Sequence, residues 1–262
     1  MKVLFQDGRV DDVSRDDFRT KFETIPTPWG EFNSALGGGL LVGGVTTIAA
    51  RPGTGKSSAV EQITEFVCES GIAEVLFWGL EMGRSGHFLR LENRFGPSVI
   101  NWGVTWVDMP GSDFYRLERV LRAIDAEDEG CLKGMILVVD FIQCIQLAGM
   151  SERESLKAFC KSQNEMAADL GLSVIWVSQM NRGIESDTNS RDTPKMSDLE
   201  GCGAIEQYSD AIIMPVRPSV QTGVPVLSAK ERTTFWVPKS RRGGVGKFTL
   251  AFEGATQTFW SM

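Results

Sequence analysis

The sequence predicts an α/β fold with a mostly parallel central sheet and helices on both of its faces. Short apolar, β-branched runs alternate with longer segments in which apolar residues recur every three or four positions. The run at 134–140 is apolar until its last residue, which is typical of a central strand covered on both faces. A glycine-rich turn also separates the strand expected at 45–50 from the helix expected after it.

The remaining elements are expected in order along the chain. Residues 1–28 form a polar arm, with a short helix around 16–22 and two prolines at its end, and residues 29–262 form one domain. Ser151 and Glu154 have the spacing of a capping box at the start of a helix. Further strands are expected at 74–80, 104–109, 172–178 and 210–216, a closing pair at 235–239 and 247–252, and helices at 85–95, 113–128 and 151–171.

The composition narrows the class of protein. The chain has 27 Lys and Arg against 34 Asp and Glu, which argues against wrapping duplex nucleic acid on an outer surface but permits a narrow basic groove. The N-terminus lacks the pattern of a signal peptide, and no run is long and apolar enough for a membrane span. Five scattered cysteines without a C-x-x-C pair argue against a disulfide framework. We therefore expect a cytoplasmic protein without a membrane partner.

The segment ARPGTGKSS, residues 50–58, lies between a predicted strand and a predicted helix and has the pattern of a phosphate-binding loop. It matches the end of G-x-x-x-x-G-K-[ST], with Ala50 in place of the first glycine. Glycines allow successive N–H groups to point at one anion, Lys56 reaches the β- and γ-phosphates, and the Ser57 hydroxyl ligates Mg²⁺. The residues expected to bind ATP are Arg51, Pro52, Gly53, Thr54, Gly55, Lys56, Ser57 and Ser58.

Three polar residues at predicted strand ends complete the expected chemistry. Asp140 ends the buried run at 134–140, on the sheet edge where open α/β folds bind ligands, and should be the second metal ligand. Glu81 follows the run at 74–80, where its carboxylate has two interpretations: an acceptor for a proton from water or the cap of the next helix. Gln179 follows the run at 172–178, where its amide has two interpretations: a contact to the γ-phosphate or an ordinary loop amide.

A set of motifs in one order resembles the ATPase domain of the DnaB-like replicative helicases, which have a RecA-type core. The resemblance covers about residues 25–252, and the late combination of D-L-x-x-x-G-A-I-E-Q-x-x-D with K-x-R is its most specific part. The motifs are LGGGL (36–40), ARPGTGKSS (50–58), LEM (80–82), VVDFIQ (138–143), VSQMNR (177–182), DLEGCGAIEQYSDAIIM (198–214) and PKSRRGG (238–244).

The resemblance assigns roles to several of these residues. It implies that Glu81 is the general base and that Gln179 contacts the γ-phosphate. It also implies that Lys239 and Arg241 reach into the nucleotide site of the neighbouring subunit. The basic stretch at 238–247, whose glycines suggest a flexible loop, would then be a finger that acts in trans on the phosphates.

Two departures from the family pattern affect the expected partners. The family has a helical domain before the motor, and since residues 1–28 are too few to form one, we expect its contribution to be absent or supplied by another protein. In the loop that contacts DNA in the family, Glu200 replaces an arginine. The residues expected to hold the backbone of single-stranded DNA instead are Arg182, Arg191, Lys195, Gly201 and Gly203.

Three functions are compatible with these residues. The first is a ring-forming, hexameric ATP-driven DNA helicase for replication, encoded by a phage or plasmid, working in the host cytoplasm and served by a separate primase or loader. The second is a RecA-like recombination or annealing factor that forms filaments on single strands, because rings and filaments can use the same head-to-tail interface. The third is a loader-type nucleotide switch, against which the complete set of Lys56, Glu81 and Asp140 argues.

Overall fold

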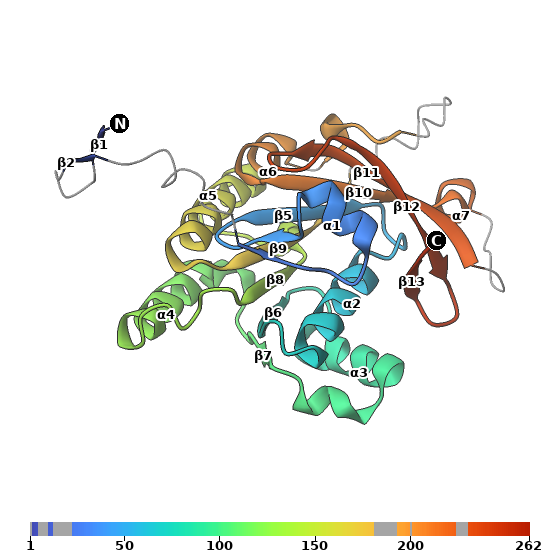
Figure 1. Ribbon diagram of the computed structural model, residues 1–262, viewed down its shortest axis with the longest axis horizontal. Helices are drawn as coiled ribbons and strands as arrows, with labels where there is room; N and C mark the ends of the chain where they lie inside the picture. Colours follow the sequence, from blue (N-terminus) through green and yellow to red (C-terminus); the bar gives the residue numbers. More distant parts are fainter. Residues whose placement is uncertain (1, 5–9, 13–22, 181–192, 200, 224–229) are drawn as a thin grey trace.

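The computed structural model describes residues 2–4, 10–12, 23–180, 193–199, 201–223 and 230–262 (Figure 1). Within these residues, nine strands form one sheet in the order β13-β12-β11-β10-β5-β9-β8-β6-β7. The helix expected at 16–22 lies outside the described residues. No helix among the described residues is both long and apolar enough to span a membrane.

The parallel part of the sheet confirms the predicted fold class. Each neighbouring pair from β10 to β7 runs in parallel. The strand expected at 104–109 is shorter than predicted and ends at Trp106. The strands are β5 (Val45–Ala50), β6 (Val75–Gly79), β7 (Val104–Trp106), β8 (Ile136–Asp140), β9 (Ser173–Gln179) and β10 (Ala211–Val216).

Antiparallel strands extend the sheet beyond β10. The expected closing pair is present as β11 (Lys230–Ser240) and β12 (Gly246–Glu253). An additional strand, β13 (Thr258–Ser261), pairs with β12 and was not predicted. The backbone of Phe259 in β13 accepts hydrogen bonds from Gln62 and from the indole of Trp29, so the last strand is tied to the first helices of the domain.

Two apolar cores cover the two faces of the sheet because side chains along each strand alternate. In β9, Val174 and Trp176 face one core, whereas Ile175 and Val177 face the other. Figure 1 places α4 and α5 together on one side of the sheet, and both contribute residues to the same core. The helices are α1 (Gly30–Leu36), α2 (Lys56–Glu69), α3 (Gly83–Phe95), α4 (Phe114–Glu127), α5 (Glu152–Leu170), α6 (Cys202–Tyr208) and α7 (Pro218–Thr222), and the short strand pairs are β1 (Lys2–Leu4) with β2 (Val10–Asp12) and β3 (Thr24–Ile25) with β4 (Leu40–Leu41).

The start of α5 confirms the predicted capping box. The Ser151 hydroxyl accepts from Glu154 N at 3.3 Å, and the Glu154 carboxylate accepts from Ser151 N at 2.9 Å.

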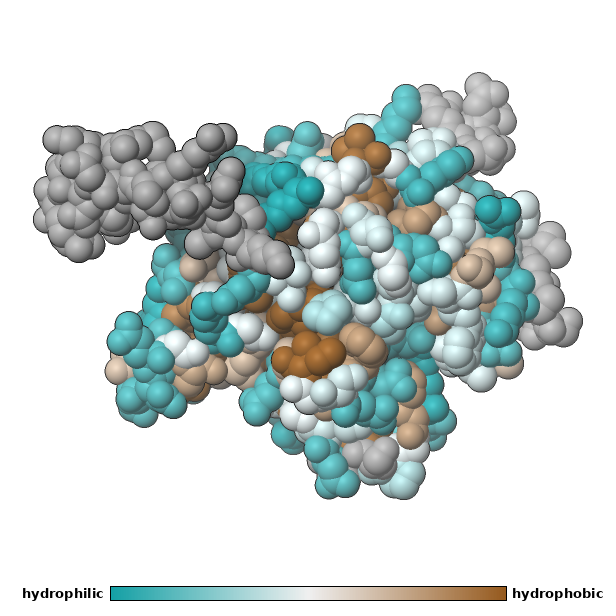
Figure 2. Space-filling view, viewed as in Figure 1, coloured by the Kyte–Doolittle hydropathy of each residue, from teal (hydrophilic) through white to brown (hydrophobic). Residues whose placement is uncertain are grey.

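The largest apolar side chains are buried, including Trp78, Trp176 and Phe77. On the face shown in Figure 2, hydrophilic residues accordingly predominate and hydrophobic ones appear in small groups.

A half-buried carboxylate on α2, that of Glu65, should make the stability of this fold depend on pH. Burial, with the nearby charge of Glu69, raises the pKa of Glu65 to about 7, and the charge of Arg94 opposes the shift. Between pH 4.5 and 7 the folded chain therefore binds more protons here than the unfolded chain, so stability falls as pH rises. We expect Glu65→Gln to raise the free energy of unfolding at pH 8 by about 1–3 kcal/mol. At pH 4.5 the variant should have little effect.

Urea unfolding at the two pH values measures this difference. Glu127→Gln, at an exposed position near the end of α4, is the matched control and should change stability equally at both pH values. A gain from Glu65→Gln of the same size at pH 4.5 and pH 8 would show that the Glu65 carboxylate does not carry the pH dependence.

Candidate active site

The phosphate loop is shaped by glycines that have two separate functions. Gly53 and Gly55 have positive φ angles of 74° and 103°, a region that favours glycine. Gly55 is also packed against aromatic rings, since a Cβ there would lie 2.9 Å from Phe259 and 3.2 Å from Phe252. Gly55 is the residue before α2, so the loop directs backbone N–H groups and the positive end of a helix at one point. This geometry is suited to binding a phosphate.

Lys56 lies in the loop with its ammonium group held by backbone carbonyls. Its Nζ donates to Ala50 O at 2.9 Å and to Arg51 O at 3.1 Å, and the residue is 9% exposed. Burial lowers the pKa of Lys56 to about 8, although the nearby charges of Asp140 and Glu81 act in the opposite direction. A buried ammonium group is costly unless it is paired, so the site favours an anionic ligand.

Asp140 and Ser57 lie together beside Lys56. Asp140 is the last residue of β8 and is 2% exposed. Burial raises the pKa of its carboxyl, and a hydrogen bond from the Ser57 side chain opposes that shift. Within the described part of the chain, no group hydrogen-bonds to the buried Oδ2 atom. The Asp140 carboxylate, with its buried Oδ2, and the Ser57 hydroxyl match the few ligands that a protein supplies to Mg²⁺ when phosphates supply the others.

Glu81 and Gln179 reach the same edge of the sheet through the strand pairing. Gly79 of β6 is in register with Asp140, and Leu80 N donates to Asp140 O at 2.7 Å. Gln179 is in register with Ala50, the last residue of β5. Gln143 fixes the end of β9, because its Oε1 accepts from Gln179 N at 3.2 Å and its amide group donates to Ser178 Oγ at 2.8 Å.

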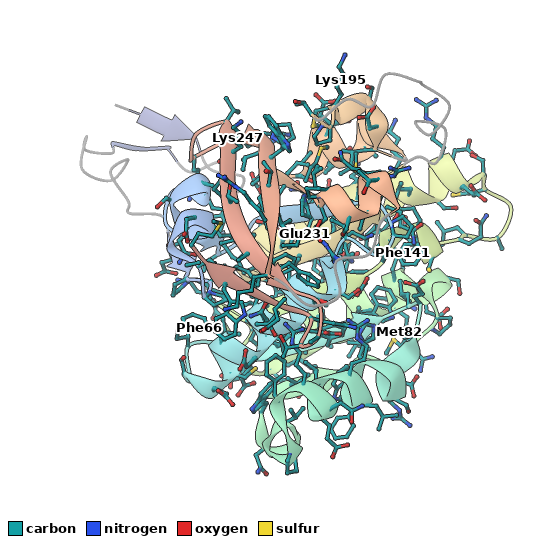
Figure 3. The ribbon with its side chains drawn as sticks, turned by 90° about the vertical axis from the view of Figure 1, so that its right-hand side faces the viewer. Phe66, Met82, Phe141, Lys195, Glu231 and Lys247 are labelled. Carbon is teal, nitrogen blue, oxygen red and sulfur yellow. The ribbon has the colours of Figure 1, made fainter. Side chains whose placement is uncertain are left out.

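These residues line one pocket with a volume of about 560 Å³. Figure 3 shows Met82 and Phe141, which both line it, well separated from Lys195 and Lys247. The structure brings together most of the residues predicted from the sequence: Pro52, Gly53, Gly55, Lys56, Ser57, Ser58, Glu81, Asp140 and Gln179 line this pocket. Arg51 and Thr54 belong to the same loop, whose turn is closed by a bond from Thr54 N to Arg51 O.

The far side of the pocket was not predicted from the sequence. Arg217, the residue after β10, donates to Gly53 O at 3.1 Å and to Glu231 Oε2 at 3.1 Å. Its guanidinium lies 4.0 Å from the centre of the Phe252 ring. Arg90, Phe252 and Gln257 line the same side. The only signal in the sequence was an arginine directly after a predicted strand, and nothing pointed to the turn between β12 and β13.

The Arg217 side chain should contribute to nucleotide affinity. It supports the carbonyl of Gly53 in the phosphate loop and presents a cation to the pocket, so we expect Arg217→Ala to raise the Kd for ATP about tenfold, or about 1.4 kcal/mol. Glu231 keeps its bonds from Ser219 N and Oγ, which should preserve the fold. Arg232→Ala, at an exposed position on β11, is the control and should leave affinity unchanged. Equal Kd values for both variants would show that Arg217 does not contribute to nucleotide binding.

Lys239 and Arg241 lie near the amino ends of the parallel strands, whereas the phosphate loop lies at their carboxyl ends. Arg241 donates to Asp210 Oδ1 at 2.9 Å and to Gln207 O at 3.1 Å, and Lys239 Nζ donates to Glu206 O. Asp210 precedes β10, and its Oδ2 accepts from Val45 N, at the start of β5. The phosphate loop follows the other end of β5, about 15–20 Å away at the rise of a strand.

Neither Lys239 nor Arg241 is among the described residues that line the pocket. The basic loop also differs from the flexible segment that its glycines suggested. Its backbone is fixed by a bond from Arg241 N to Asp210 O at 2.9 Å and from Gly243 N to Ser240 Oγ at 2.9 Å. The position of Arg241 within its own chain is therefore well defined and remote from its own pocket.

The residues expected to contact DNA lie away from the pocket where they are described. Lys195 is exposed and precedes the 3₁₀ turn Met196–Asp198. Gly201 adopts a left-handed conformation before α6 and packs against Leu156, whereas Gly203 faces open space. Arg182 and Arg191 lie outside the described residues.

The chain is similar in sequence to replicative DNA helicases. The chain is 27% identical over 255 residues to the replicative DNA helicase DnaC of Bacillus subtilis, covering 87% of this chain and 54% of that protein. It is 26% identical over 255 residues to the replicative DNA helicase DnaB of Geobacillus stearothermophilus, again covering 87% of this chain and 54% of that protein. The chain thus spans about half the length of the curated relatives it matches.

Solved structures confirm the RecA-like fold. A DnaB-like replicative helicase, described with its interactions with primase, has a TM-score of 0.80 at 20% identity and covers 94% of this chain and 66% of that one. A separately solved ATPase domain superposes with a TM-score of 0.77 at 21% identity, covering 96% of this chain and 100% of that one. The family described as the DnaB-like helicase C terminal domain matches residues 97–261. The chain belongs to the DnaB-like helicase C-terminal domain family.

Proposed function

We propose that the chain is the ATP-hydrolysing motor of a ring-forming DNA helicase, with residues 29–262 as the motor and residues 1–28 as an arm. The observation that carries this proposal is that Arg241 and the phosphate loop, which are expected to act on the same phosphates, lie far apart within one chain. The phosphate loop lies at the carboxyl end of β5, and Arg241 is anchored beside its amino end. In a head-to-tail assembly of identical subunits, the two opposite sides of neighbouring copies meet, so each pocket would receive its cation from the next chain.

The proposed reaction is hydrolysis of the terminal phosphate of ATP. Lys56 and the N–H groups of the loop bind the β- and γ-phosphates, and Glu81 accepts a proton as water attacks the γ-phosphorus. The bond between the γ-phosphorus and the bridging oxygen breaks, and ADP and phosphate leave. Gln179 contacts the γ-phosphate. When Mg²⁺ is bound it neutralises charge on the phosphate oxygens, and Ser57 and Asp140 would hold it.

The neighbouring subunit would supply Lys239 and Arg241. A guanidinium offers two parallel donors to phosphate oxygens and stays charged at any working pH. Negative charge that builds on these oxygens in the transition state is stabilised far better by a fixed cation in a dry cleft than by water. Hydrolysis would then depend on assembly, and a hexameric ring could couple events in successive pockets.

The proposed partner is single-stranded DNA, held by its backbone without sequence preference. Lys195 and the N–H groups of Gly201 and Gly203 are the described candidates, together with Arg182 and Arg191 from the adjoining segment. Binding through phosphates predicts a strong dependence on salt concentration. A separate primase or loader would act with the ring, as the family resemblance suggests.

Unwinding of a forked duplex tests the helicase against the alternatives. We expect ATP-dependent strand separation and closed ring particles in single-particle images of the nucleotide-loaded protein. A RecA-like recombination factor would instead form filaments on single strands without unwinding, and a loader-type switch would bind ATP without sustained turnover. Family membership favours the motor over both, and either of those two outcomes would contradict it.

A further inference from the structure

The segment that carries Arg241 is packed against the end of α1, more than two hundred residues earlier in the chain. Ser240 Oγ donates to Ala35 O at 3.2 Å and accepts from Gly243 N at 2.9 Å. Gly37, which ends α1, has a φ of 75°, and a Cβ there would lie 3.1 Å from the carbonyl carbon and oxygen of Arg242. The turn after β11 thus lies directly on the backbone of α1.

Gly243 is the closest contact in this packing. A Cβ at position 243 would lie 2.6 Å from the carbonyl carbon of Ala35 and would overlap the carbonyl oxygen. Both neighbours are backbone atoms, so no side chain can rotate away to make room. By contrast, a Cβ at Gly244 would meet nothing within 4 Å. Neither glycine has a φ in the positive region, so alanine would meet no strain from its own φ angle at either position.

Asp210 holds the same segment from the other side. Its carbonyl oxygen accepts from Arg241 N at 2.9 Å, and its carboxylate accepts from Arg241 Nη1 at 2.9 Å and from Val45 N at 2.9 Å. A single residue therefore joins the backbone and side chain of Arg241 to the first residue of β5. The Arg241 side chain remains 50% exposed, so its guanidinium can exchange the Asp210 carboxylate for another anion while its backbone stays in place.

We infer that the backbone of Arg241 is fixed by a group of residues that we call the finger seat, so that its guanidinium is presented to the phosphate of the neighbouring subunit. The finger seat consists of Ala35, Gly37, Asp210, Ser240 and Gly243. This inference rests on the proposed function, because it assigns the seat to the trans-acting finger. Gly243 and Asp210 are positioning residues that act through Arg241. A finger on an unrestrained loop would lose conformational entropy each time it docked, whereas a seated finger has already been ordered by folding.

Gly243→Ala and Gly244→Ala form the matched pair that tests the seat. We expect Gly243→Ala to lower ATP turnover of the assembled protein by about 10- to 100-fold, since displacements of about 1 Å can cost 10²-fold in rate. The Kd for ATP should stay within about twofold because the pocket is unaltered. Gly244→Ala should retain wild-type turnover. Wild-type turnover in Gly243→Ala would overturn the inference.

Mixing experiments separate a misplaced finger from general damage. A Gly243→Ala subunit keeps its own pocket, and a Lys56→Ala subunit keeps its own finger, so equal mixing should restore turnover at about a quarter of the interfaces in a ring. Sedimentation confirms that the variants assemble. Absence of rescue between assembled partners would overturn the inference, because the seat is assigned to the finger alone.

Ser240→Ala tests the finger seat without adding atoms, and Arg241→Ala tests the finger itself. If Gly243→Ala does not fold or assemble, Ser240→Ala removes the bond to Ala35 and the acceptor for Gly243 N without adding atoms, and it should lower turnover about 3- to 10-fold. Unchanged turnover in Ser240→Ala would then count against the seat. Arg241→Ala tests the proposed function separately: if it retains turnover the finger itself is wrong, whereas if it loses turnover and the seat variants do not, only the seat is wrong.

Discussion

Arg241→Ala should reduce ATP turnover by about 10³-fold or more while the Kd for ATP changes by less than about twofold. The reason is geometric. Arg241 is anchored at Asp210, at the amino edge of the sheet, and its own phosphate loop lies at the carboxyl edge. It should therefore act on the pocket of a neighbouring subunit, where it stabilises the transition state more than the bound nucleotide. Steady-state hydrolysis and binding of a fluorescent ATP analogue measure the two effects separately.

Lys247→Ala is the control for Arg241→Ala. Lys247 belongs to the same basic segment, but its ammonium lies 5.0 Å from the centre of the Trp236 ring and it has no proposed part in catalysis. Its removal should leave turnover unchanged. The strongest support would be complementation: Arg241→Ala and Lys56→Ala subunits, each inactive alone, should hydrolyse ATP when mixed. Full activity of Arg241→Ala alone would refute the finger.

Lys56→Ala should abolish turnover, with a loss of about 10³-fold or more, and should also weaken ATP binding. The variant should nevertheless be as stable as the wild type. Lys56 is buried with its pKa lowered to about 8, so its charged form is costly in the folded chain and its removal relieves that cost. Thermal unfolding without nucleotide should therefore show no loss of stability.

Lys161→Ala, at an exposed position on α5, controls for loss of a positive charge and should leave both turnover and stability unchanged. Nucleotide should raise the unfolding temperature of the wild type more than that of Lys56→Ala, because the stabilisation by a ligand increases with its affinity. Wild-type turnover in Lys56→Ala would show that the phosphate loop is not the hydrolytic site.

Local pattern was sufficient to predict which side chains meet at the carboxyl ends of the parallel strands. Asp140 ends an apolar run, Gln179 follows one, and the loop that carries Lys56 follows a third. Parallel strands bring such ends together. The capping box at Ser151 could be predicted for the same reason, since its hydrogen bonds connect residues three positions apart.

Contacts between distant segments could not be predicted in this way. Arg217 and Phe252 meet only because β10, β11 and β12 pair across the sheet, and β13 is placed by its bonds to Gln62. Gly243 shows the limit most directly. In the sequence it suggested a loose loop, but its purpose is close packing on Ala35, which no local pattern records.

A structure of the assembled protein with a non-hydrolysable ATP analogue and Mg²⁺ tests most directly whether the pocket is completed by Arg241 of a neighbouring subunit. We expect Arg241 of one subunit to lie within about 3 Å of the terminal phosphate bound by Lys56 of the next, at a charge-assisted hydrogen-bond distance. If Arg241 instead remains on Asp210 of its own chain at every nucleotide-loaded interface, far from any phosphate, the pocket is not completed in trans and Arg241 is not a finger.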